Sequence, residues 1–233
     1  MNSAQDTFKS GTIASFPTLF GYMSIGIAFG VVGVASNLSV LEITLLSILI
    51  YAGAAQFIFC GLYLVGTPMS VIIFTTFIVN LRHFLMALAI APSFTKYSVL
   101  RNIGFGTLLT DESFGVAIAE KAKSNTLHGK WMDGLNVTAY LAWIAASIIG
   151  AFVGNWIPSP EKFGLDFALS AMFIALLVLT ISASPKSKIM HYLKLIGVMV
   201  FVIYGLLYIF PSHLAVIVST LIVATIGVVT ERK

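Results

Sequence analysis

Apolar residues follow one another along this chain in four long stretches that contain no charged side chain. The stretches are Ser10–Leu41, Ile43–Leu81, Gly134–Pro160 and Leu195–Thr230, and they hold 32, 39, 27 and 36 residues. An α-helix needs about 20 residues to cross the hydrocarbon core of a bilayer. The pattern therefore predicts an all-α integral membrane protein that crosses the membrane several times.

Glycine, proline, asparagine and charged residues divide these stretches into eight candidate crossings. The crossings are Ile13–Ala35, Ile43–Val65, Ser70–Ala91, Asn102–Ala119, Gly134–Ile157, Leu165–Ala183, Leu193–Phe210 and Leu214–Val229. The fourth is short and carries Asp111 and Glu112 at its midpoint, so a re-entrant or broken helix, with seven crossings in total, is the alternative. The whole chain, 1–233, is predicted to be a single transmembrane domain with short polar tails at 1–12 and 230–233.

The composition excludes several classes of protein. Hydrophobic residues make up 58% of the chain and charged residues 9%, which is too little charge to cover the surface of a soluble domain. The net charge of +4 is scattered over short connections, so nothing favours nucleic-acid binding. The sequence has no phosphate-binding loop, zinc-binding histidine pair, nucleophile elbow or potassium-channel filter, and its one cysteine, Cys60, lies in an apolar stretch. We therefore expect no enzymatic activity, no cofactor and no metal site.

Lysine and arginine residues predict the orientation. With eight crossings and a cytoplasmic N-terminus, nine of them fall on the cytoplasmic side, whereas Lys96, Arg101 and Lys162 fall on the other. The nine are Lys9, Lys121, Lys123, Lys130, Lys186, Lys188, Lys194, Arg232 and Lys233. Because cytoplasmic connections carry an excess of basic residues, both termini are predicted to be cytoplasmic.

Two short similarities suggest that the chain consists of two repeated halves. Gly26-x-x-x-Gly30 resembles Gly150-x-x-x-Gly154, and both motifs permit close approach of helices. The segments 52–58 and 168–174 also align, at an offset of 116 residues. Duplicated halves with discontinuous helices are a feature of secondary transporters, so this is our hypothesis for the fold; chance similarity in so apolar a sequence is the alternative.

Ionisable residues in the middle of two crossings are the strongest indication of a functional site. Asn80, Arg82 and His83 lie in the third crossing, and Asp111 and Glu112 lie in the fourth. A charged side chain at the bilayer centre costs about 2.5–3.5 kcal/mol on insertion scales, so opposite charges at similar depth are expected to meet. We expect Arg82 to pair with one acid, while the other acid and His83 face a polar cavity. A purely structural ion pair and a position at the membrane interface are the alternatives.

Two further features suit either packing or binding. The first crossing holds four glycines between Gly21 and Gly33, as expected for close helix packing and equally for a broken helix whose backbone binds a ligand. Gln56 lies among small residues in the second crossing, where it either binds substrate or bonds to a neighbouring helix. From the residues alone, the prediction is a secondary transporter or a channel for a small solute.

Four blocks of sequence also carry a resemblance to a known family. They are GIAFGVVGVASNLSVLEITLLSILIYAGAAQFIFCGL, NLRHFLMALAIAP, LLTDESFGVA and GLDFALSAMFIALL. In order and spacing they resemble the AzlC/YgaZ family, the large subunits of two-component exporters of branched-chain amino acids. The similarity covers about residues 16–177 and departs from the family pattern at Asn37, where glycine is usual, and at Ser170, where proline is usual.

The resemblance implies secondary active export of leucine, isoleucine and valine, and often methionine, across a bacterial plasma membrane in exchange for protons. It also implies a partner, a small hydrophobic subunit of the AzlD/YgaH type. A channel for small neutral solutes and a non-transporting assembly or sensing subunit are the competing functions.

Such a substrate is a zwitterion with an aliphatic tail, so it needs an anion site, a cation site and an apolar pocket. The residues expected to bind it are Gly26, Phe29, Gly30, Gln56, Phe57, Asn80 and Arg82. The residues expected to carry the coupled proton are His83, Asp111 and Glu112. The arginine or the glycine backbone would bind the carboxylate, an acid the ammonium group or the proton, and the histidine would relay protons. The two amides would orient the substrate, and the two phenylalanines would line the tail pocket.

Overall fold

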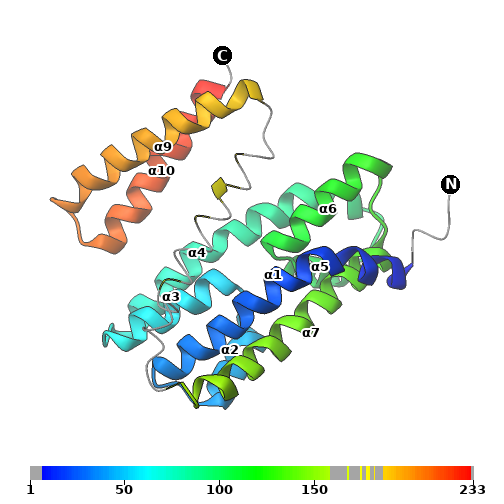
Figure 1. The fold of residues 1–233 in the computed structure, drawn as a ribbon. Helices are drawn as coiled ribbons and strands as arrows, with labels where there is room; N and C mark the ends of the chain where they lie inside the picture. The colour runs from blue at the N-terminus through cyan, green and yellow to red at the C-terminus, as the bar shows by residue number, and fades with distance from the viewer. Residues whose placement is uncertain are drawn as a thin grey trace. The chain divides into compact units, whose positions relative to one another are not determined.

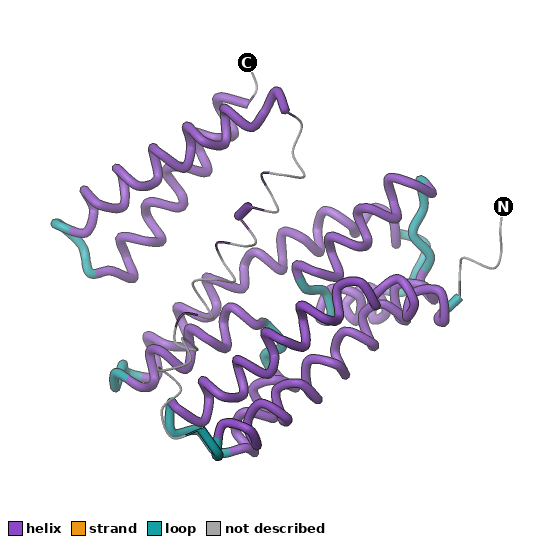
Figure 2. Tube along the Cα trace, in the orientation of Figure 1, coloured by secondary structure: helices purple, strands orange, loops and turns teal. Residues whose placement is uncertain are grey.

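The computed structural model describes residues 7–157 and 186–231, together with 167, 174, 177–178 and 181. Its elements are α1 (Phe8–Ala35), α2 (Val40–Leu49), α3 (Gly53–Leu64), α4 (Met69–Ile90), the 3-10 helix η2 (Ala91–Phe94), α5 (Val99–Thr107), α6 (Asp111–Ser124), α7 (Gly129–Gly154), α9 (Lys186–Leu207) and α10 (Ser212–Glu231), as Figure 1 shows. No strand occurs among the described residues, in agreement with the predicted all-α membrane fold (Figure 2). The chain packs as two compact units, Met1–Leu169 and Ser170–Lys233. The predicted crossing Leu165–Ala183 and the segment 168–174 fall almost wholly outside the described residues.

Three helices of the first unit are long and apolar enough to cross a bilayer. These are α1 with 28 residues, α4 with η2 with 26, and α7 with 26. At 1.5 Å per residue each is about 40 Å long, more than the roughly 30 Å of the hydrocarbon core. They correspond to three of the predicted crossings, Ile13–Ala35, Ser70–Ala91 and Gly134–Ile157.

Glycine holds α1 and α7 together. A methyl group added at Gly30 would overlap the backbone of Ser147 and Gly150, and one at Gly11 would overlap the carbonyl of Trp131. Early residues of α1 thus meet early residues of α7, so the two helices run in the same direction. Because α1 is one continuous helix, its glycines permit close packing, and the predicted alternative of a broken first crossing is wrong.

The predicted second crossing, Ile43–Val65, is two short helices that form a re-entrant hairpin. α2 begins with a capping box, in which the backbone N–H of Glu42 donates to the Ser39 hydroxyl and the Ser39 N–H donates to the Glu42 carboxylate. It stops before Tyr51, whose φ of 41° lies in the left-handed region and breaks the helix. The Gln56 amide of α3 then donates to the Ser47 hydroxyl of α2 at 3.2 Å, so the two helices meet near the turn that joins them.

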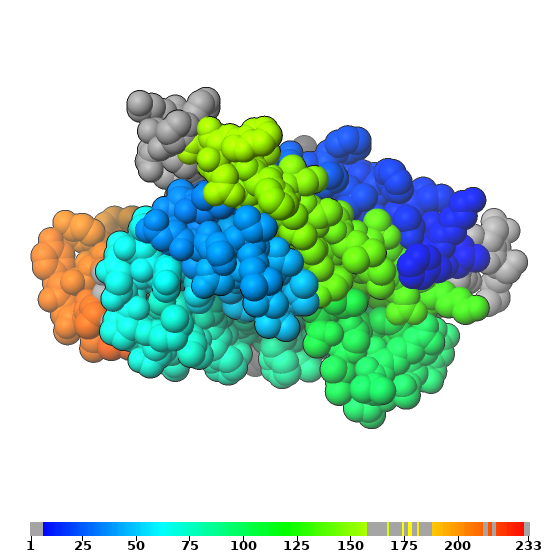
Figure 3. All heavy atoms as spheres, turned by 90° about the horizontal axis from the view of Figure 1, so that it is seen from below, coloured from blue at the N-terminus to red at the C-terminus, as the bar shows by residue number. Residues whose placement is uncertain are grey.

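The hairpin spans only part of the membrane. α2 has ten residues and α3 has twelve, lengths of about 15 and 18 Å against a hydrocarbon core of roughly 30 Å. The start of α2 and the end of α3 line one cavity, which includes Leu38 and Tyr63. In the space-filling view of Figure 3, α2 lies between the end of α7 and the surface formed by α3 and the start of α4. The prediction of a continuous crossing over residues 43–65 is therefore wrong.

The predicted fourth crossing, Asn102–Ala119, is a second re-entrant hairpin, made of α5 and α6. α5 runs back along α4, where a cavity is lined by Ile90 and Phe94 of α4 and η2 and by Phe105 of α5. The chain turns at residues 108–110, and the end of α6 returns to the level of residues 92–96. The alternative of a broken, re-entrant segment is thus confirmed at this place.

Because the hairpins do not cross the bundle, they also determine at which end of it each basic residue lies. The backbone N–H of Gly129, at the start of α7, donates to the Tyr97 hydroxyl at 2.8 Å. Arg101 pairs with Asp133 of α7, and Gly134 of α7 packs against the backbone of Phe8 in α1. Lys96 and Arg101 therefore lie at the end where α7 and α1 begin, the end that also holds Lys9. The eight-crossing arrangement placed them on the opposite side from Lys9, and the structure contradicts that placement.

The second unit is a helical hairpin of α9 and α10. A turn around Pro211 joins the two helices, and a methyl group at Gly227 of α10 would lie 3.2 Å from the Leu195 side chain of α9. These helices match the predicted crossings Leu193–Phe210 and Leu214–Val229, with α9 beginning seven residues earlier than predicted.

Candidate functional site

An ion pair joins the middle of α4 to the beginning of α6. A terminal nitrogen of Arg82 lies 2.6 Å from an Oδ atom of Asp111. Arg82 is the fourteenth residue of the 26 in α4 and η2, so the pair lies near half depth. The expected meeting of the basic and acidic clusters is confirmed, and Asp111 is the acid that pairs.

Local sequence places the two acids at the tip of the second hairpin. Thr110 caps α6 through a capping box with Ser113, in which each residue's backbone N–H donates to the other's hydroxyl. Asp111 and Glu112 therefore occupy the first turn of the helix, where its dipole stabilises negative charge. The hairpin thus places the Asp111 carboxylate beside Arg82 of α4, at a depth where lipid offers no group to neutralise the arginine.

Asn80 and His83 extend this cluster along α4. His83 lies within electrostatic range of both Asp111 and Arg82. The Oδ1 atom of Asn80, the Nδ1 atom of His83 and the Nε atom of Arg82 are buried and make no hydrogen bond to the described residues. These groups retain unused hydrogen-bonding capacity beside an ion pair, which suits a site where a proton or a polar ligand is handled.

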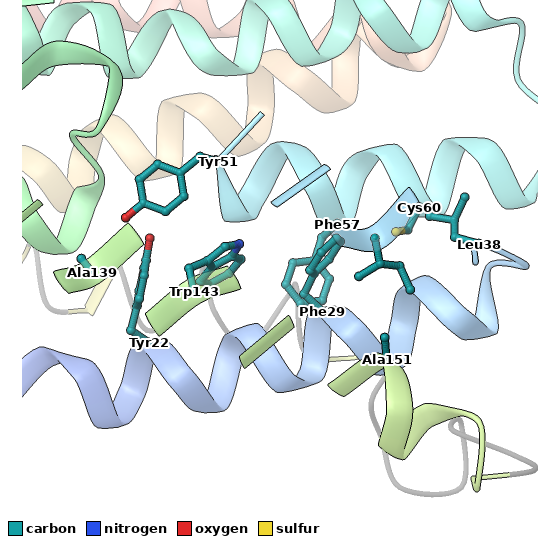
Figure 4. Close-up of a cluster of buried hydrophobic side chains, with 10 residues drawn as sticks. Tyr22, Phe29, Leu38, Tyr51, Phe57, Cys60, Ala139, Trp143 and Ala151 are labelled. Carbon is teal, nitrogen blue, oxygen red and sulfur yellow. The ribbon is translucent and has the colours of Figure 1, made fainter. Parts of the chain in front are cut away.

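Glu112, unlike Asp111, lies near two tyrosines. Glu112 lies within electrostatic range of the hydroxyl groups of Tyr22 in α1 and Tyr51 at the tip of the first hairpin. Thr110 lies close to both hydroxyls as well. Each tyrosine is 5% exposed, and their hydroxyl groups point toward one another in Figure 4. The two re-entrant tips thus meet at one polar position.

Neither tyrosine stands out in the sequence as a candidate site residue. A tyrosine in an apolar stretch is ordinary, and only the break after α2 turns Tyr51 toward α1. The one available signal was its place directly before Ala52-Gly53-Ala54-Ala55, a run of small residues that permits close approach of other groups.

The remaining predicted site residues lie in a packed core around Trp143 (Figure 4). The Trp143 indole N–H donates to the side-chain carbonyl oxygen of Gln56 at 2.9 Å. The Gln56 side-chain N–H in turn donates to the Ser47 hydroxyl, so this amide links α3 to α7 and to α2. The ring of Phe29 meets those of Phe57 and Trp143 at centroid distances of 5.7 and 6.2 Å. These side chains are fully buried and face one another.

The two glycines that were expected to offer free backbone lie in the same core. A methyl group at Gly26 would lie 2.8 Å from the Ala146 side chain, and Gly30 is covered by the α7 backbone. Since α1 is helical through both positions, their N–H groups are engaged in the helix. The structure therefore gathers Asn80, Arg82, His83, Asp111 and Glu112 in one cluster and places Gly26, Phe29, Gly30, Gln56 and Phe57 in the adjoining core.

Residues 17–157 match the family model described as AzlC protein. The chain is 30% identical over 182 residues to the inner membrane protein YgaZ of Escherichia coli K12, covering 74% of this chain and 72% of that protein. It is 29% identical over 194 residues to the branched-chain amino acid transport protein AzlC of Bacillus subtilis 168, covering 82% and 72%. An uncharacterized membrane protein of Archaeoglobus fulgidus is 31% identical over 173 residues, covering 73% and 74%. No solved structure matches the chain. The family match includes α1 from Pro17 onward, both hairpins and α7.

Proposed function

This chain belongs to the AzlC protein family, and we propose that it is the large subunit of a secondary transporter that exports leucine, isoleucine, valine and methionine across a bacterial plasma membrane. Transport is the role in the name of the Bacillus subtilis relative. The observation that carries the proposal is the Arg82–Asp111 pair, held near half depth where a re-entrant tip meets a long helix.

The chemistry of the substrate suits this region of the molecule. A branched-chain amino acid carries one positive group, one negative group and an aliphatic tail. The region offers acids, an arginine and helix N-termini within an apolar bundle, and transporters commonly bind small solutes where discontinuous helices meet at mid-membrane. Channels for neutral solutes have no need of this charge at such depth, which favours a carrier.

Proton coupling is assigned to His83 and the two acids. An imidazole with an unused ring nitrogen beside Asp111 and Arg82 is placed to exchange a proton with the carboxylate. Glu112 lies at the same tip without an ion-pair partner among the described residues. Proton uptake by this group of side chains would alter the charge balance that holds the second tip against α4.

A small hydrophobic subunit of the AzlD/YgaH type is the proposed partner. The outer face of α4 exposes large apolar side chains, among them Phe77 at 60% and Leu85 at 64%. The Arg82 side chain is 35% exposed on the same helix. A charge facing lipid at this depth is costly, so a second chain that covers this part of α4 would stabilise the pair.

Counterflow of labelled leucine in proteoliposomes tests the proposal. With the chain and its small partner reconstituted together, leucine inside the vesicles should stimulate saturable uptake of labelled leucine, and an imposed pH gradient should change the net flux. A channel would show no stimulation by internal leucine, and a sensing or assembly subunit would show no flux. Equal counterflow by this chain alone would contradict the two-subunit part of the proposal and leave the transport part standing.

A further inference from the structure

The two re-entrant tips approach the same level from opposite ends of the first unit. Tyr22, in the middle of α1, lies beside the tip of the first hairpin at Tyr51 and also beside Thr110 at the tip of the second. Beyond each tip a helix begins, α3 at Gly53 and α6 at Asp111. Two half-length helices thus present their N-terminal ends to one small region.

The N-terminus of α3 is uncapped and buried. Its cap residue is Ala52, which has no side-chain acceptor, and the first backbone bond of the helix runs from Gln56 N–H to the Ala52 carbonyl. The N–H groups that precede it have no acceptor within the helix, because every α-helix leaves its first amides unused. Ala54 and Ala55 are 3% and 0% exposed, so water does not reach this turn freely. By contrast, side chains cap both α2 and α6.

A second observation points independently to a ligand at this place. The Tyr51 hydroxyl makes no hydrogen bond to the described residues, although the residue is only 5% exposed. Its oxygen is directed away from the first hairpin toward Tyr22 and Glu112, as Figure 4 shows for the two tyrosines. A buried hydroxyl without a partner is uncommon in a folded protein, and a bound polar group would supply the missing bond.

We propose that the region between the two tips is the binding site for the charged backbone of an α-amino acid. The first-turn N–H groups of α3 and the Tyr51 hydroxyl donate to the substrate carboxylate, and the Glu112 carboxylate accepts from the substrate ammonium group. This inference deepens the proposed function and rests on it, because it presumes an amino acid as substrate. The substrate reaches the site when the tips separate, since both tyrosines are buried where the tips meet.

This assignment differs from the expectation drawn from the sequence. Arg82 is engaged with Asp111 at 2.6 Å, so one of its terminal nitrogens already holds a carboxylate oxygen. The backbone near Gly26 and Gly30 is helical and covered by α7. The first turn of α3, by contrast, has no side-chain cap, so its N–H groups are the candidate donors to a substrate carboxylate.

Binding of three probes to the full-length chain, purified together with its small partner, tests the proposal. The probes are L-leucine, L-leucinamide, which lacks the carboxylate, and 4-methylpentanoate, which lacks the ammonium group. Removing a hydrogen bond to a charged group weakens binding by about tenfold or more. Tyr51→Phe should therefore weaken leucine and 4-methylpentanoate about tenfold and leucinamide clearly less, because a neutral amide oxygen accepts a weaker hydrogen bond than a carboxylate. Glu112→Gln should weaken leucine and leucinamide and spare 4-methylpentanoate.

Tyr140→Phe is the matched control. Its ring packs edge-on against Tyr51 at a centroid distance of 4.8 Å, but its hydroxyl already donates to the Ile48 carbonyl at 2.9 Å. The affinity ratios between the three probes should be unchanged in this variant. A second variant, Ala52→Ser, gives α3 a capping hydroxyl that competes with the substrate carboxylate. It should weaken leucine without lowering the melting temperature of the ligand-free protein.

The outcomes separate this inference from the proposed function. If the unmodified complex binds leucine saturably while Tyr51→Phe and Glu112→Gln keep all three affinity ratios, the site assignment is overturned and the proposed function stands. If Tyr140→Phe changes the ratios as much as Tyr51→Phe does, the assignment is overturned too. If the unmodified complex binds none of the three probes, the proposed function fails, and this inference fails with it.

Discussion

At the scale of single residues, the Arg82–Asp111 pair is the contact on which the second hairpin depends. The two side chains are 35% and 22% exposed and lie near half depth. An unpaired charge at that depth costs about 2.5–3.5 kcal/mol on insertion scales. The pair therefore stabilises the tip of α6 against α4 chiefly because losing either partner would leave the other uncompensated.

Neutralising one partner should be more harmful than neutralising both. We expect Arg82→Leu to lower the free energy of unfolding by about 2–3 kcal/mol, because Asp111 is left unpaired. The double variant Arg82→Leu with Asp111→Leu should recover most of that loss and should bind leucine within about threefold of the unmodified protein, a difference below 1 kcal/mol. Equilibrium unfolding in detergent and leucine binding provide the two readouts.

Arg101→Leu is the control for that series. Arg101 and Asp133 also form an ion pair at 2.6 Å, but at the end of the bundle, with side chains 40% and 38% exposed. Exposed pairs of this kind contribute about 0–1 kcal/mol, so its loss should matter little. Leucine binding that stays absent in the double variant while the protein folds normally would assign Arg82 to the substrate and contradict the account.

Individual charged residues were predictable from the sequence, whereas the uncharged polar groups near them were not. Arg82, Asp111 and Glu112 stand out because their cost in lipid is high wherever the helices lie. The partner of Gln56 depends on where Trp143 lies, and the position of the Tyr51 hydroxyl depends on a backbone break. Neither follows from residue type, because an amide or a hydroxyl in an apolar stretch is compatible with either packing or binding.

At the scale of elements, glycine determines how closely α1 and α7 approach. Gly30 faces Gly150 across the interface, so the two sequence motifs that suggested close packing do contact each other. Gly21 lies on the same helix with nothing within 4 Å of an added methyl group. Substituting alanine at each of these two positions therefore distinguishes the effect of interface packing from the effect of helix propensity.

We expect Gly30→Ala to lower the free energy of unfolding by about 1–3 kcal/mol, because the added methyl group forces the α7 backbone away. Gly21→Ala should leave stability unchanged or raise it by up to about 1 kcal/mol, since alanine is the better helix former. Unfolding followed by tryptophan fluorescence measures both. Equal stability of the two variants would mean that α1 and α7 do not pack through these glycines.

The hairpin of α5 and α6 could be predicted from the sequence, whereas the hairpin of α2 and α3 could not. Asp111 and Glu112 interrupt an apolar stretch, and the Thr110–Ser113 capping box marks the start of a helix inside it. Residues 43–65 contain neither a charge nor a proline, so their composition is that of an ordinary crossing. Only Tyr51, with a φ of 41°, ends α2 there, and a positive φ at tyrosine is set by the surrounding packing.

At the scale of the whole molecule, the described lysines and arginines of the first unit other than Arg82 gather at one end. The helix ends and connections at that end carry Lys9, Lys96, Arg101, Lys121, Lys123 and Lys130. The described connections at the opposite end, 36–39, 65–68 and 155–157, carry none. Since cytoplasmic connections are enriched in lysine and arginine, the end that holds Lys9 should be cytoplasmic. With two half-length hairpins, the basic residues are divided more unequally between the two sides of the membrane than with eight full crossings.

Accessibility of single cysteines tests the re-entrant arrangement most directly. The native Cys60 is fully buried and should stay unlabelled by a membrane-impermeant maleimide. Lys9→Cys and Lys96→Cys should label only after cells are permeabilised, whereas Val65→Cys, in the connection between α3 and α4, should label in intact cells. Labelling of Lys96→Cys but not Lys9→Cys in intact cells would contradict the account, because it would place these residues on opposite sides of the membrane.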